Sequence, residues 1–198
     1  GVVQKDCLPK TAWPPTYDPI TKTTPLTLPF PMNGDPLIVT RSGRILSWVR
    51  DGEDAGVCNV SGEIKDTPLF IGVPFESSYT FSTFAVRENG SGGGGGNAVT
   101  TGRLQLRSLS LSCNGTGFIE IDVTPSFRKT STYTFTGREL GHGTNVIGNI
   151  PLYTGTIKCP LLSLNTQAVV RVHSDSFLPF ALVNAAWEGF YNARHSRV

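Results

Sequence analysis

Two carboxylates separated by one residue are the first side chains in this sequence that could do chemistry. Glu120 and Asp122 lie in the run GFIEIDV and alternate with apolar residues. Because side chains of a β-strand alternate between its two faces, both acids are expected on one face. Such a pair can act as general acid and base in glycoside hydrolysis. No third polar group at a matching position supports catalysis, so a solvated strand face is the preferred interpretation.

The other candidates for catalytic or metal-binding groups are isolated in the sequence. His142 lies in a glycine-flanked loop, and neither His173 nor His195 stands at a metal-ligand spacing from it. The acidic stretch Asp51–Gly56 lacks the spaced ligand set of a calcium loop, which favours a plain acidic turn. Nothing matches a nucleophile elbow or a phosphate-binding loop. The sequence therefore indicates no catalytic residue, no cofactor and no bound metal.

The strands that would position the two carboxylates are expected in residues 101–123. Asn114-Gly115 supplies the positive φ that a narrow hairpin turn requires, so we predict two strands joined by a tight turn. In the first strand the apolar phase slips by one residue at Arg107 and Ser108. This slip predicts a β-bulge or an exchange of buried faces.

Composition indicates an all-β protein. The 198 residues include 22 glycines and 14 prolines, so turns are frequent and long helices are not expected. Short strand-like runs between Gly, Pro and Asn predict an antiparallel β-sandwich or barrel-like module, after a proline-rich irregular region over residues 1–36. Segment 181–194 has helix-forming composition, but Pro179 before it and Gly189 within it favour a strand plus tail.

Charge and cysteine content narrow the function classes. A net charge of +2 is too small to indicate a nucleic-acid-binding or membrane-surface protein. The cysteines have no zinc spacing, and we prefer buried free thiols to two disulfides because a chain of this length can build a core without them. They are Cys7, Cys58, Cys113 and Cys159.

The run GSGGGGG at residues 90–96 marks the best boundary within the chain, because glycine cannot bury apolar surface. It is either a flexible loop or an engineered join. A subdivision into 1–88 and 103–198 around the glycine-rich loop 89–102 follows. The chain starts at Gly1 without a methionine, which suggests a fragment or a processed chain.

Several segments occur in a characteristic order: LFIGVPFESSYTFSTFAVRE, TGRLQLRSLSLS, GFIEIDV, YTFTGRELG and the ending LPFALVNAAWEGFYNARHSRV. Together they resemble the C-terminal region of tail nozzle proteins, the tail tubular protein B family of short-tailed bacteriophages. The resemblance covers about Leu69 to Val198, and TLPFPMNGDPLIVTRSG fits more loosely. The order of the segments carries it, rather than any single motif.

The resemblance implies a structural virion protein and not an enzyme. It implies that 1–198 is an all-β fragment of a larger subunit. Six such subunits would form a homohexameric ring, the lower tail tube, below an adaptor ring of the tail tubular protein A type and close to the tail fibres. Double-stranded DNA would pass through without sequence-specific binding, and no small-molecule substrate is implied. Assembly in the bacterial cytoplasm would favour free thiols. A receptor- or carbohydrate-binding β-sandwich module of a phage tail is the alternative.

The ending of the chain supplies the candidate contact residues. Trp187, Glu188, Arg194 and Arg197 resemble the family's ending, which implies a role in packing or subunit contacts. A core aromatic is the simpler interpretation of Trp187. A solvated terminus is the simpler interpretation of the two arginines.

Overall fold

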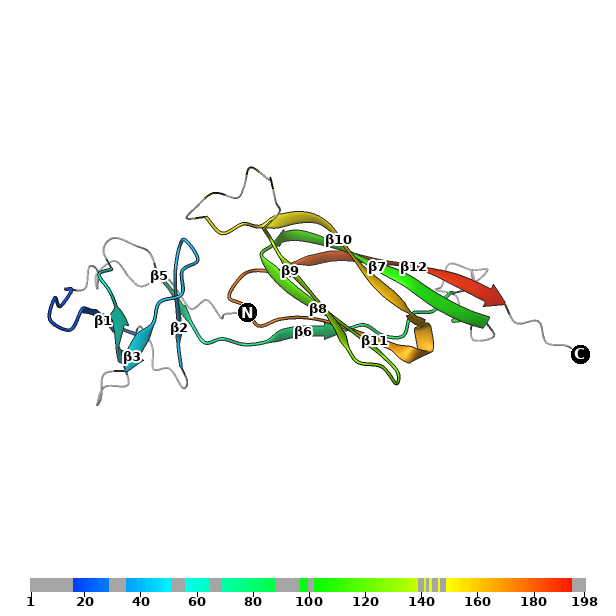
Figure 1. Cartoon of the computed structure of the whole chain (residues 1–198), viewed down its shortest axis with the longest axis horizontal. Helices are drawn as coiled ribbons and strands as arrows, with labels where there is room; N and C mark the ends of the chain where they lie inside the picture. Colours follow the sequence, from blue (N-terminus) through cyan, green and yellow to red (C-terminus); the bar gives the residue numbers. More distant parts are fainter. Residues whose placement is uncertain are drawn as a thin grey trace, which may run out of the picture. The chain divides into compact units, whose positions relative to one another are not determined.

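The fold is all-β (Figure 1), which confirms the predicted class. The computed structural model describes residues 16–28, 35–50, 56–64, 69–87, 97–99, 102–138, 141, 143, 146 and 149–193. Their regular structure is antiparallel β-strand with one 3₁₀ turn, η2 (Asn165–Gln167). Much of the proline-rich region expected over 1–36 lies outside them. Within this described part, no helix is long and apolar enough to cross a membrane.

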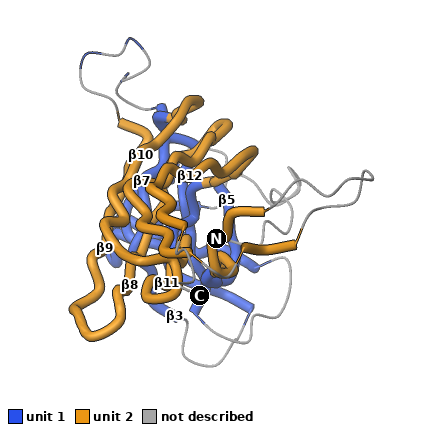
Figure 2. Tube along the Cα trace, turned by 90° about the vertical axis from the view of Figure 1, so that its right-hand side faces the viewer, with its two compact units in different colours: residues 1–76, 140–151, 175–178 blue, residues 77–139, 152–174, 179–198 orange. Residues whose placement is uncertain are grey.

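The chain forms two compact units (Figure 2). Unit 1 comprises residues 1–76, 140–151 and 175–178, and unit 2 comprises residues 77–139, 152–174 and 179–198. The glycine run 90–96 lies outside the described residues. The subdivision expected around residues 89–102 therefore stays a prediction.

Unit 1 has a small apolar core of its own. One sheet has the strand order β1-β4-β3, and β2 pairs with β5. Ile38, Val60 and the free thiol of Cys58 belong to one buried cluster. Burial raises the pKa of Cys58 to about 11, so this thiol stays protonated at neutral pH. The strands are β1 (Thr23–Thr27), β2 (Leu37–Thr40), β3 (Trp48–Arg50), β4 (Val57–Ser61) and β5 (Leu69–Gly72).

Unit 2 is a sandwich of two antiparallel sheets. The three-stranded sheet has the order β10-β7-β12, and the four-stranded sheet has the order β6-β11-β8-β9. Every connection except that from β8 to β9 passes from one sheet to the other. The strand predicted over 181–194 is confirmed as β12. The strands are β6 (Ser77–Thr80), β7 (Gly102–Thr116), β8 (Phe118–Pro125), β9 (Ser131–Thr136), β10 (Tyr153–Leu164), β11 (Ala168–Ser174) and β12 (Leu182–Ala193).

The core of unit 2 lies between these sheets and depends most on β7. Side chains from both sheets alternate inward, as period-2 patterning requires. The free thiols of Cys113 and Cys159 are part of this core. The buried cluster consists of Phe84, Leu104, Leu106, Leu109, Leu111, Cys113, Ile119, Ile121, Val123, Cys159, Leu161, Val170 and Val172.

A β-bulge keeps both halves of β7 in this core. Leu106 lies opposite Gly189 of β12, and Ser108 lies opposite Glu188, so Arg107 is one extra residue on β7. The extra residue shifts the alternation by one and restores the apolar phase beyond it. The predicted bulge is confirmed, and both halves of β7 face the same core.

The hairpin predicted for residues 101–123 is wrong. β7 and β8 belong to different sheets and do not pair. Directly after β7, the Gly117 N–H donates to the Pro179 carbonyl at 2.8 Å. The chain is therefore still bonded there to the segment that leads into β12. Gly115 does have a positive φ of 59°, but it lies in an irregularity of β7 against β10. Asn114-Gly115 therefore lies in a bulge of β7, just before the chain crosses to the other sheet.

Aromatic rings cover both sides of the sandwich core. Phe84, which follows β6, lies 6.2 Å from Trp187 of β12 between ring centroids. Phe135 of β9 lies 5.0 Å from Tyr153 of β10. β9, β10 and β12 are edge strands, and Phe84 follows the edge strand β6, so the rings shield apolar residues near the edges of both sheets.

The bulge allows a close approach of β12 that a larger residue would prevent. A Cβ at Gly189 would lie 2.6 Å from the backbone oxygen of Gln105. We expect Gly189→Ala to lower the free energy of unfolding by roughly 1–3 kcal/mol, the usual cost of overpacking, in urea denaturation. Gly143→Ala is the control, because no atom of the described residues lies within 4 Å of a Cβ placed there. Equal stability of the two variants would contradict this packing.

Candidate functional site

Glu120 and Asp122 lie on the outer face of the four-stranded sheet, as the alternation of β8 predicts. Ile119 and Ile121 point to the opposite face and are buried. The acids are less open to solvent than expected, since their side chains are only 25% and 21% exposed. The reason is that β8 is an inner strand, flanked by β11 and β9.

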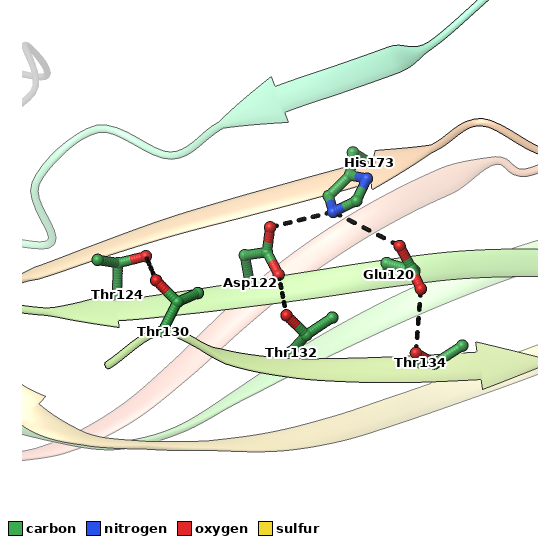
Figure 3. Close-up of polar contacts among 7 residues, drawn as sticks. All are labelled: Glu120, Asp122, Thr124, Thr130, Thr132, Thr134 and His173. Carbon is green, nitrogen blue, oxygen red and sulfur yellow. Dashed lines mark hydrogen bonds and ion pairs between the residues drawn. The ribbon is translucent and has the colours of Figure 1, made fainter. Parts of the chain in front are cut away.

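His173 lies between the two carboxylates (Figure 3). Its Nε2 atom is 3.1 Å from Asp122 Oδ2 and 3.8 Å from Glu120 Oε2, and its side chain is 15% exposed. His173 is the register partner of Glu120 across the β11–β8 pair. The sequence pattern predicted no third polar group beside these acids, and that prediction is wrong. Alternation in β11 does place His173 on an outer face, but only the strand order brings it to these acids.

Threonines of β9 hold the other oxygen of each carboxylate (Figure 3). Thr132 Oγ1 donates to Asp122 Oδ1 at 2.6 Å, and Thr134 Oγ1 donates to Glu120 Oε1 at 3.1 Å. Thr–acid–His contacts therefore run across three strands of one sheet. Such cross-strand pairs stabilise a sheet and fix its register. Among the described residues, no group of His, Cys, Asp and Glu has the geometry to hold a metal ion.

Trp187 and Glu188 lie on opposite faces of β12. Trp187 is partly buried against the core of unit 2 and contacts Phe84. Glu188 Oε2 accepts hydrogen bonds from Lys158 Nζ and Ser108 Oγ, both at 2.9 Å. The Lys158 hydrogen bond, followed by that of Ser108, lowers the pKa of the Glu188 carboxyl. Glu188 thus ties β12 to β7 and β10 on the outer face.

Other predicted positions lie outside the described residues. Arg194 and Arg197 of the candidate contact set are among them. So are His142, His195 and residues 51–55 of the acidic stretch. The structure therefore brings together Glu120, Asp122 and His173, and separately Glu188 with its partners on β7 and β10.

The described part of unit 2 thus consists of two sheets whose polar outer side chains bind one another across the strands. A model of the bacteriophage nozzle protein family matches residues 4–198, and the chain belongs to that family. It is a structural protein of the phage tail, located in the virion. This membership agrees with the resemblance found in the order of segments, and it argues against an enzyme.

Within the tail proteins, the chain is similar to the tail tubular protein gp12 of Escherichia phage T7. The two are 28% identical over 139 residues, which cover 70% of this chain and 17% of the T7 protein. The chain therefore spans only a small part of the length of this relative.

Removal of the central histidine should destabilise the four-stranded sheet. His173→Ala leaves two partly buried carboxylates without the group between them. We expect the free energy of unfolding to fall by roughly 1–3 kcal/mol, the range for a lost polar partner, in urea or thermal denaturation. Val169→Thr, on the exposed side of the same strand, should change stability by less than about 0.5 kcal/mol. A similar small effect for both would contradict a stabilising network.

The lowered pKa of Glu188 should depend on Lys158. The stabilisation from this ion pair is present above the ordinary glutamate pKa and is lost as the pH falls through the lowered pKa. In a ¹³C NMR titration of the side-chain carboxyl, Lys158→Met should move the pKa of Glu188 upward. Lys129→Met, a control in the β8–β9 connection, should leave it in place. An unchanged titration in Lys158→Met would exclude the ion pair.

Proposed function

We propose that this chain is part of a subunit of the nozzle ring that forms the lower tail tube and through which DNA is ejected into the host. The family match over residues 4–198 is the observation that carries the proposal. The similar T7 protein is described as a tail tubular protein, which supports a role in a tube.

The build of unit 2 fits the wall of such a tube. Cross-strand networks on both outer faces and aromatic rings at both sides give a stiff module without a cofactor. A ring arises when one surface of a subunit binds a different surface of the next and the rotation closes. A conduit must also avoid gripping DNA, because phosphate contacts sum to strong, salt-sensitive binding. A net charge of +2 for the whole chain is compatible with weak contact.

The partners follow from the same proposal. The subunits would form a hexamer, with an adaptor ring above it and tail fibres nearby, assembled in the bacterial cytoplasm. Trp187 would support β12 from inside the sandwich. Glu188, Arg194 and Arg197 would then be the candidates for contacts between subunits.

Electron microscopy of the complete gene product that contains this chain tests the proposal. Six-fold rings with an axial hole are expected, because head-to-tail interfaces around one axis close into a ring. A monomer that binds defined glycans on an array would instead identify a receptor-binding module. Rings of another symmetry would support the proposed tube but would contradict the proposed hexamer.

A further inference from the structure

The turn between β8 and β9 carries a side chain that the fold of unit 2 does not use. Phe127 is fully exposed, with a relative exposure of 102%. The Arg128 N–H donates to the Pro125 carbonyl at 3.2 Å, which closes a four-residue turn with Phe127 in its third position. An aromatic residue at the tip of such a turn adds nothing to the core.

Phe127 also has an unfavourable backbone conformation. Its φ is 64°, in the left-handed region where glycine or asparagine is the usual residue of such a turn. A bulky residue there is strained, and strain of this kind concentrates at binding sites. Neither the core nor the turn geometry explains a phenylalanine at this position.

Neighbouring contacts hold the turn in place. The Ser126 N–H donates to the Gln167 carbonyl at 2.6 Å, which ties the turn to η2. The hydroxyls of Thr124 and Thr130 lie 2.9 Å apart and close its base (Figure 3). An aromatic side chain presented in a fixed position loses little conformational entropy when it binds a partner.

The residues beside Phe127 indicate the charge of that partner. Arg128 and Lys129 are exposed, and neither has an ion-pair partner among the described residues. Residues 123–131 contain no acidic residue. Aromatic and arginine side chains are the groups that dominate protein interfaces. The turn thus combines an apolar tip with two unpaired positive charges.

We propose that the Phe127 tip, residues Ser126–Lys129, docks into an apolar pocket edged with carboxylates on another protein subunit of the tail. Phe127 fills the pocket, and Arg128 and Lys129 pair with its acids. A protein is favoured over a lipid because the chain belongs to a family of structural tail proteins. The proposal goes beyond the nozzle ring, since it assigns one contact whatever the symmetry of the assembly.

Substitution by glycine separates folding from docking. In the phage that encodes this chain, Phe127→Gly should leave the protein folded, because it relieves the strained φ. It should lower the yield of complete tails at least about tenfold, as loss of an aromatic anchor does. Lys22→Gly is the matched control, because Lys22 is an exposed turn residue with a φ of 55° in unit 1. Complete tails at the wild-type yield in Phe127→Gly would overturn the proposal.

Charge reversal and crosslinking test the partner directly. Arg128→Glu with Lys129→Glu keeps Phe127 and should also reduce complete tails. A benzoyl-phenylalanine at position 127 should crosslink, in purified particles, to one acidic peptide of a tail protein. The same group at Val183, which is 71% exposed on β12 in the other sheet of unit 2, should not reach that peptide. Crosslinks to lipid alone, or Phe127-dependent binding to phosphatidylglycerol–phosphatidylethanolamine vesicles, would identify a membrane contact and overturn the proposal.

Discussion

Burial of one face of β7 is the constraint on which the rest of unit 2 depends. This strand has 15 residues and is the centre of the three-stranded sheet, so its inner face meets most of the core. Leu106, Leu109 and Leu111 are fully buried, and complete burial of such a side chain contributes about 1.5–3 kcal/mol. An unbroken alternation would turn half of these residues to solvent. The bulge at Arg107 prevents this, and it sets the register in which β12 can pair.

The sheet-crossing connections make each sheet dependent on the other. Among the described strands of unit 2, β8 and β9 are the only consecutive pair in one sheet, so neither sheet is built from a continuous stretch of sequence. The edge strands then meet across the core through Phe84–Trp187 and Phe135–Tyr153. Strands of another chain can pair with the edge strands of a sheet, and a sandwich can open at these edges. Trp187 therefore has a packing role in the core, in line with the simpler interpretation of this residue from the sequence as a core aromatic.

Local patterns in the sequence predicted the features that depend on local physics. The phase slip predicted the bulge at Arg107 and Ser108, and the proline and glycine near β12 predicted a strand. Alternation also placed Glu120 and Asp122 on one face. The failures concern strand partners, which no local pattern contains. Asn114-Gly115 supplies a positive φ in a hairpin or in a bulge, and only packing decides between them. His173 reaches the two acids because β11 pairs with β8, a choice made by the whole core.

Two parts of the four-stranded sheet differ in whether contacts within the fold account for their side chains. Around Glu120, Asp122 and His173, donors and acceptors satisfy one another within the sheet, so this part of the face needs no partner for stability. In the turn at the end of the same sheet, Phe127 is strained and fully exposed, and the cations beside it form no ion pair with the described residues. Natural sequences break local rules mainly where function requires it. A satisfied face and an exposed, strained tip on one module would suit the proposed tube wall, because such a module has to be stable and also has to bind a neighbour at a defined point.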